Sequence, residues 1–366
     1  MFNPSRLEFA RKRRGLTKKE LASKIGLTPR SISMFENNES PPADDTIRKL
    51  SLALAFPQSF FSGDDIEVLR QKTVSFRSMS RMSASKRDAA LSSGAIAFMF
   101  NRWIEQHFTL PEPNLIEVEK GENPEAAAMI LRQHWGVGEL PIRNVIHLLE
   151  AKGIRVFSLS ENTLEVDAYS LWEDGTPFIF LNTIKSAERS KFDAAHELGH
   201  LILHKHGAPV GQDAEREADQ FASAFLMPRS SVLASTSSAH LATLSTLIKL
   251  KKKWGVSLAA LSYRMHKIGL LSDWHYRTLC IEISQKGYNK NEPEGIEREH
   301  SKIWEMVFSS LREDGITKEH IARELDIHTM EIESLVFGLL LMNVIHGSNN
   351  PSHKKPNNPS YLHVVK

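Results

Sequence analysis

The sequence predicts a mainly α-helical protein with an α+β domain near its middle. Short segments with helical periodicity and their own start signals fill the first sixty or so residues. Three strand-like runs lie further along the chain, at Ile154 to Leu159, Glu165 to Trp172 and Pro177 to Leu181. They lead into an apolar helix that carries the sequence His196-Glu-Leu-Gly-His200, and helical patterns return after residue 272. We therefore expect a helix-turn-helix bundle, a domain with a small sheet, and a helical C-terminal region.

Composition limits the class of protein. The 366 residues suffice for two or more domains, and the 41% hydrophobic and 25% charged fractions are typical of a globular protein. The lone Cys280 excludes a disulfide framework and a cysteine-rich zinc fold, and it fits a reducing compartment. The start of the chain has no secretory signal, and its most apolar run, Leu335 to Ile345, is shorter than the roughly 20 residues of a membrane span. We expect a cytoplasmic protein with no membrane partner.

Residues 1–62 form the first predicted domain. Its four helices are expected at Arg6 to Arg13, Lys18 to Ile25, Pro29 to Asn37 and Asp44 to Ala55. Thr17 begins a capping box, Thr28 precedes a proline at the next helix start, and Gly26 stands where the turn between two helices needs a positive φ. Two helices joined in this way place the second in the DNA major groove. The first 50 residues carry 11 Lys or Arg against 6 Asp or Glu, which favours a nucleic-acid partner.

This domain resembles the phage-repressor-like (XRE) helix-turn-helix family. The residues that carry the resemblance are Leu16-Thr-Lys-Lys-Glu-Leu-Ala22, Gly26-Leu-Thr28, Ile32-Ser33 and Phe35-Glu-Asn37. The resemblance implies binding to double-stranded operator DNA and is compatible with a homodimer. It implies base contacts from Arg30, Ser31, Ser33 and Met34, and phosphate contacts from Lys18 and Asn37. Pro29 departs from the family, which often has Gln there, so one side-chain reader of bases is missing. The alternative is a helical protein-interaction domain with a solvated basic face.

The remaining chain divides at changes in composition. Residues 63–112 are expected to form a helical connector that packs on its neighbours, because Gly and Pro are sparse before Pro111. Residues 113–272 begin with helices near 124–134 and 141–152 and continue into the three strand-like runs. A helical region is expected at 273–347, and the composition of residues 348–366 predicts a disordered tail.

The pentapeptide at 196–200 predicts a metal site. Two histidines four residues apart lie on one face of a helix, where His196 and His200 can reach one ion, and Glu197 is placed to act as a base. A third ligand is expected from the next helix, in which Glu215 and Asp219 share a face while Glu217 points about 200° away from Glu215. Either glutamate could serve.

The pattern Glu-x-x-x-Asp after His-Glu-x-x-His resembles the zincin-like gluzincin arrangement, and this resemblance favours Glu215 as the ligand. Asp219 is then expected to accept a hydrogen bond from a ligand histidine. With Zn²⁺ bound, Glu197 would take a proton from water that attacks a peptide carbonyl. The segment Tyr263-Arg-Met-His266 offers oxyanion donors, namely Tyr263, Arg264 and His266, although a structural role for these side chains is the simpler interpretation.

Two further features near the motif have competing interpretations. The run Phe178-Ile-Phe180 would pair with an extended peptide if it formed a sheet edge, whereas its composition favours an ordinary core strand. His204 shares a face with His200, and a structural or capping role is expected for it because three ligands are already assigned.

The same segments resemble zinc metallopeptidases of the ImmA/IrrE type. The matching residues are Arg189 to His204, Glu215 to Ala222 and Leu226-Met-Pro228, and the resemblance extends from about residue 75 to 272. It implies cleavage of, or control over, transcriptional regulators, and in some members a role in toxin and antitoxin pairs. The family commonly has Asn where this chain has Asp219, which adds a negative charge near the metal.

The C-terminal region contains a weak copy of the first domain. Thr317 to Ile327 parallels Thr17 to Leu27, but residues 313–333 carry 2 basic and 7 acidic residues, a net charge of −5 that repels phosphate. We interpret this region as a helical packing or partner-binding unit.

Two functions follow from these features. The first is a DNA-binding regulator fused to a zinc-dependent endopeptidase that cleaves or controls a regulatory protein. The second is a transcriptional repressor or antitoxin whose zinc site is non-catalytic or senses a signal.

Overall fold

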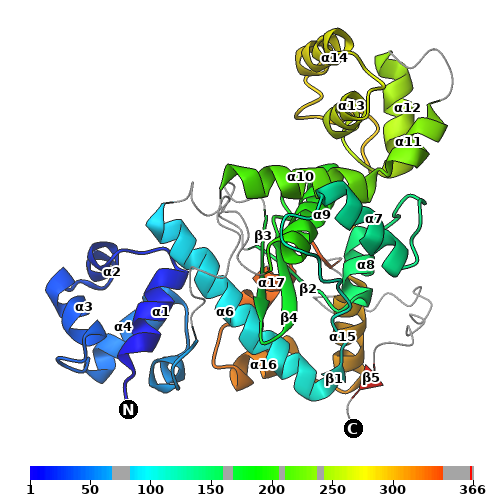
Figure 1. The fold of residues 1–366 in the computed structure, drawn as a ribbon. Helices are drawn as coiled ribbons and strands as arrows, with labels where there is room; N and C mark the ends of the chain where they lie inside the picture. Colours follow the sequence, from blue (N-terminus) through cyan, green and yellow to red (C-terminus); the bar gives the residue numbers. More distant parts are fainter. Residues whose placement is uncertain (68–82, 160–167, 206–210, 237–242, 341–362, 365–366) are drawn as a thin grey trace.

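The computed structural model describes residues 1–67, 83–159, 168–205, 211–236, 243–340 and 363–364. Within these ranges the fold is mainly helical, with a small mixed sheet near the middle of the chain, as predicted (Figure 1). None of the described helices combines the length and apolar character that a membrane span requires. The N-terminal helices lie on one flank of the long helix α6, and the sheet lies with α9 and α10 beyond it (Figure 1).

The N-terminal bundle agrees closely with the sequence prediction. Its elements are α1 (Pro4–Arg13), α2 (Lys18–Ile25), α3 (Pro29–Glu36), α4 (Asp44–Leu54) and the 3₁₀ helix η1 (Gln58–Ser62). The capping box is present, because the Thr17 side chain accepts from the backbone N–H of Glu20 and the Glu20 side chain accepts from that of Thr17. Gly26 has a φ of 72°, as the turn between α2 and α3 requires. Helix α1 begins earlier than predicted because Asn3 caps it through the backbone N–H of Ser5.

Helix α6 (Ala84–His107) joins this bundle to the rest of the protein. It packs against α1 on one side and α17 (Thr329–Val336) on another, and its central residues are buried. After α6, strand β1 (Phe108–Thr109) pairs antiparallel with β5 (His363–Val364). The expected connector is therefore a packed helix where it is described. The predicted tail lies outside the described residues except for β5.

The central domain builds a three-stranded sheet under two antiparallel helices. Its elements are α7 (Pro124–His134), α8 (Val145–Ala151), β2 (Arg155–Ser158), β3 (Ala168–Glu173), β4 (Thr176–Leu181), α9 (Ala187–Leu203) and α10 (Gln212–Leu226). The strand order is β2-β4-β3, with β4 parallel to β2 and antiparallel to β3. Phe178 to Phe180 belong to a core strand, as their composition favours, and the alternative of a sheet edge is wrong, because β4 lies between two strands and is buried. The edge strand that packs against α9 is β3.

A helical lobe follows α10 and projects beyond it (Figure 1). It consists of α11 (Arg229–Ser235), α12 (Leu244–Trp254), α13 (Leu258–Lys267) and α14 (Asp273–Gln285). Lys251 of α12 is fully buried and forms ion pairs with Glu188 of α9 at 3.2 Å and with Glu292 at 3.3 Å. These pairs tie the lobe and the segment after α14 to the start of α9.

The C-terminal helices repeat the first three helices element by element. Helices α15 (Lys302–Glu313), α16 (Lys318–Glu324) and α17 follow the pattern of α1, α2 and α3 at an offset of 300 residues, except that α15 begins two residues earlier and α16 ends one residue earlier. The turn residues correspond as well: Gly15 and Gly315 have φ angles of 62° and 72°, and Gly26 and Asp326 have φ angles of 72° and 56°. Helix α17 is mostly buried and contacts α6 and β2. The weak copy seen in the sequence is therefore a second helix-turn-helix unit that packs inside its own chain.

Candidate metal centre and DNA-reading helix

The metal motif lies on α9, which is held close to α10. Ser186 caps the helix by accepting from the backbone N–H of Arg189. A Cβ atom at Gly199 would lie 3.1 Å from Phe221 and 3.3 Å from the Cα of Ala218, so the glycine permits the close approach of the two helices. This contact sets α10 at the distance from which its acidic side chains reach the histidines.

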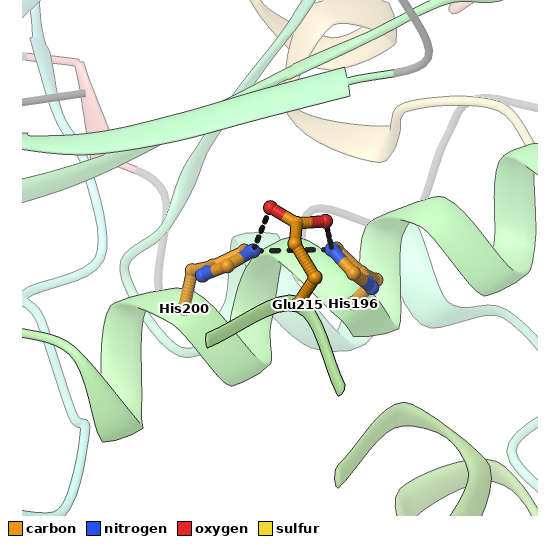
Figure 2. A group of neighbouring side chains, drawn as sticks. All are labelled: His196, His200 and Glu215. Carbon is orange, nitrogen blue, oxygen red and sulfur yellow. Dashed lines mark hydrogen bonds and ion pairs between the residues drawn. The ribbon is translucent and has the colours of Figure 1, made fainter. Parts of the chain in front are cut away.

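The side chains of His196, His200 and Glu215 converge on one point (Figure 2). The two Nε2 atoms are 3.1 Å apart, and the Glu215 carboxylate oxygens lie 3.4 Å from His196 Nε2 and 3.6 Å from His200 Nε2. A tetrahedral zinc site with bonds of 2.0–2.2 Å separates its ligand atoms by about 3.3–3.6 Å. The three distances are close to this range, with the nitrogen–nitrogen distance slightly shorter, so the donors fit one face of such a tetrahedron and leave the fourth corner for water or substrate.

Glu217, the alternative ligand, points elsewhere. One carboxylate oxygen of Glu217 lies 3.0 Å from His204 Nε2, on the far side of His200 from Glu215. The structure thus brings Glu215 rather than Glu217 to the two histidines, and the spacing along α10 prevents both from reaching them.

Asp219 lies where the sequence predicts an acceptor. Its carboxylate is 2.9 Å from His196 Nδ1, so this nitrogen donates and leaves Nε2 directed at the centre. Burial lowers the pKa of His196, but the bonds to Asp219 and Glu215 more than offset it and raise the pKa to about 10. His200 differs, because burial and the neighbouring His196 and His204 hold its pKa well below the usual value. The pKa values of the two ligand imidazoles are therefore shifted in opposite directions.

Glu197 is buried beside the centre and is held by the edge strand. Ser170 of β3 donates a hydrogen bond to Glu197 Oε2 at 2.7 Å. Burial raises the pKa of Glu197 to about 7, and nearby His196 partly offsets this rise. A carboxyl group with a pKa near neutral is suited to accept and return a proton. Sequence reasoning missed Ser170, because no local pattern shows which residue of a distant strand faces α9.

The three suggested oxyanion donors are not gathered at the centre. Arg264 is buried, donates to the backbone oxygen of Met227 at 3.0 Å and pairs with Glu125, so its role is structural. His266 pairs with Asp273 at 2.7 Å on the surface of the lobe. Tyr263 is half-exposed and lines a cavity of about 880 Å³ that Asp219 also lines. Only Tyr263 thus borders space next to the metal centre.

Helix α3 carries the residues suggested for base contacts at exposed and half-buried positions. Of its residues only Ile32 is buried, while Arg30 is exposed and Ser31, Ser33 and Met34 are half-buried. Ser31 also shares a hydrogen bond with Thr28 at 2.9 Å. The exposed face is therefore available to a partner over the length of the helix.

The two suggested phosphate contacts lie at the ends of this region and already have protein partners. Lys18 is 3.2 Å from Glu36, and Asn37 donates to Glu39 at 3.0 Å. Some of the basic residues counted in the sequence also form ion pairs within the protein. Arg11 pairs with Glu36 at 2.6 Å, and Arg13 and Arg14 pair with Glu331 of α17 at 2.7 and 2.6 Å. The basic surplus of the first 50 residues thus overstates the charge that faces a ligand.

Comparison with known families agrees with both resemblances. Residues 7–57 match the helix-turn-helix family model, and residues 149–266 match the peptidase family model described as the IrrE N-terminal-like domain. The second match begins at α8 and contains β2 to α10 and all residues of the metal centre. No curated protein gives a significant match to this chain. The chain therefore contains an N-terminal helix-turn-helix DNA-binding domain and an IrrE N-terminal-like, metallopeptidase-like domain.

Proposed function

We propose that this protein is a DNA-binding regulator whose central domain is a zinc-dependent endopeptidase that cleaves or controls a regulatory protein. The observation that carries the proposal is the set of three donors, His196, His200 and Glu215, spaced as one face of a zinc tetrahedron. Two nitrogens and one carboxylate are the donor set of many catalytic zinc sites. Zinc bound there supplies Lewis acidity, which lowers the pKa of water and polarises a peptide carbonyl.

The chain's own residues supply the proton transfers. Glu197 is the group that takes a proton from the attacking water and later delivers it to the leaving amine. Its buried position beside His196 keeps it close to the reacting atoms, and Ser170 holds its carboxylate. The Glu197 carboxylate thus takes up one proton and releases it again in each cycle.

An extended substrate has a natural place beside this centre. Strand β3 is one of the two edge strands of the described sheet, packs against α9 and contributes Ser170 to the Glu197 carboxylate. A peptide that paired with β3 would place a carbonyl group over α9. The peptide-binding edge proposed here is therefore β3, since Phe178 to Phe180 lie in the central strand β4.

The first test is metal content, measured by plasma mass spectrometry. We expect about one zinc per chain in the wild type and in Glu217→Ala, and loss of zinc in His196→Ala and Glu215→Ala. Wild-type protein that holds no zinc after reconstitution contradicts the proposal.

The second test addresses turnover. Newly formed protein N-termini are compared in cells that produce the wild type or Glu197→Gln, which retains every proposed zinc ligand. We expect specific new N-termini with the wild type only. If Glu197→Gln gives the same cleavage products, Glu197 is not the base and the endopeptidase proposal fails.

The match of residues 7–57 to the helix-turn-helix family supports a second candidate, a repressor or antitoxin with a non-catalytic zinc site. Under this alternative the wild type produces no cleavage, and Glu197→Gln represses and neutralises its partner as well as the wild type does. Comparing repression and proteolysis in the same variant separates the two functions.

A further inference from the structure

One cluster of titratable side chains near the metal centre is not used by the mechanism above. His204 follows α9 directly and serves as its C-cap residue, one turn beyond His200. Its Nδ1 atom is 2.8 Å from His200 Nδ1, and its Nε2 atom is 3.0 Å from the Glu217 carboxylate. The side chain of His204 is only 10% exposed, so these two contacts replace most of its contact with water.

The hydrogen bonds run from His200 through His204 to Glu217, and the positions of their protons follow from the Glu217 carboxylate at the end. A carboxylate only accepts, so His204 donates to Glu217 from Nε2. A neutral His204 then has an unprotonated Nδ1, which can only accept, and His200 must donate to it from its own Nδ1. This leaves the Nε2 atom of His200 unprotonated, and that is the atom directed at Glu215 and His196.

We propose that His204 and Glu217 are positioning residues that hold His200 in the tautomer required for metal binding. This inference rests on the proposed zinc site. The two ligand histidines are thus oriented in different ways: Asp219 contacts His196 directly, whereas Glu217 acts on His200 through His204. The arrangement also gives a role to Glu217, an acidic residue of α10 that does not face the centre.

The test is zinc affinity, measured by competition with a chromophoric chelator on the full-length protein. Loss of an outer hydrogen-bond partner typically weakens metal binding 10- to 100-fold. We expect a loss in that range for His204→Phe, which keeps a ring of similar size but has no acceptor, and a smaller loss for Glu217→Ala. Asp213→Ala is the matched control, because Asp213 is an exposed acid on the same helix that pairs only with nearby Arg216, and its affinity should equal that of the wild type.

A conservative variant separates positioning from general damage to the fold. In His204→Asn the Oδ1 atom occupies the place of Nδ1 and can accept from His200, without any need for Glu217. We expect this variant to regain most of the affinity lost in His204→Phe, and adding Glu217→Ala to it should cause no further loss. If His204→Asn binds zinc as weakly as His204→Phe, the proposed hydrogen bond is not the cause and the inference is overturned.

Tautomers are measured directly by long-range ¹H–¹⁵N NMR of the histidine rings. We expect His200 to be protonated on Nδ1 in the wild type, and to lose this preference in His204→Phe. Protonation of His200 on Nε2 instead would mean that the chain of bonds runs in the opposite direction and would overturn the inference.

The outcomes also separate this inference from the zinc site itself. If Glu215→Ala loses zinc while His204→Phe and Glu217→Ala bind it like the wild type, the site stands and the positioning role is overturned. If the wild type binds no zinc, both proposals fail together.

Discussion

The two helix-turn-helix units of this chain share one local structure and have opposite surroundings. In each unit three helices are joined by two turns, and each turn has one residue with a left-handed backbone conformation. These residues are Gly15 and Gly26 in the first unit and Gly315 and Asp326 in the second. Both middle helices begin with a capping Thr, Thr17 or Thr317. Yet only Ile32 is buried in α3, whereas most of α17 is buried against α6 and β2.

This difference shows that capping and turn chemistry specify the motif but not its use. The second unit has a net negative charge in residues 313–333, and its Glu331 is buried where it pairs with Arg13 and Arg14 of the first unit. The first unit, whose third helix is the more exposed, can contact DNA. The second unit, whose third helix is mostly buried, holds the first unit in place. Three predictions test this contrast.

The largest effect is expected from breaking the contact between the two units. In Glu331→Ala the buried Arg13 and the partly buried Arg14 lose their shared carboxylate, and removing one partner of a buried ion pair typically costs about 3–5 kcal/mol. We expect a lower denaturation midpoint and faster hydrogen exchange in α1. Glu333→Ala is the control, because Glu333 pairs with Lys318 nearer the surface and should cost less than about 1 kcal/mol. Equal exchange in both variants would show that the two units are not coupled through Glu331.

A second effect is expected from pH, because the two units begin differently. Asn3 caps α1 and Ser301 caps α15, but the start of α15 is also bound by buried Glu150 of α8, which accepts from the backbone N–H groups of Lys302 and Ile303. Burial raises the pKa of Glu150 from 4.5 to about 7. Between these values the folded protein keeps a proton that the unfolded chain has lost, so this group lowers stability as pH rises from 4.5 to 7.

The total loss from this group is on the order of 3 kcal/mol. We would compare urea midpoints at pH 5 and pH 8 in the presence of chelator, for the wild type and for Glu150→Gln. The wild type should lose more stability than the variant over this interval. Parallel behaviour of the two proteins would show that Glu150 is ionised throughout.

The smallest effect concerns DNA binding at equivalent positions of the two third helices. Arg30 and Met330 correspond under the offset of 300 residues, and both are exposed. We expect Arg30→Ala to weaken operator binding by about 1–3 kcal/mol, because a side chain that reads a base is lost. Met330→Ala should leave binding unchanged, as measured by fluorescence anisotropy at fixed salt. A comparable loss in Met330→Ala would assign DNA contacts to the second unit as well.

Much of the local structure is predictable from neighbouring residues in the sequence. The bounds of α2 and α7 are those predicted, because capping residues and helical periodicity act within a few positions. The convergence of His196 and His200 is likewise anticipated by their spacing along one helix, whereas the choice of Glu215 over Glu217, and with it the role of Asp219, rested on the family resemblance.

Contacts between distant segments were decided only by the tertiary structure. The edge strand that packs against α9 is β3, Arg264 is a structural partner of Glu125, and Arg13 and Arg14 pair with Glu331 of the second unit. Ser170 reaches Glu197 across 27 positions, and Glu217 reaches His204 from another helix. The sequence by itself thus determined which elements form and which residues share a face, since these depend on short-range periodicity. The packing of elements far apart in the chain decides which face of each element is buried and which charged residues form pairs. No local sequence pattern encodes that packing.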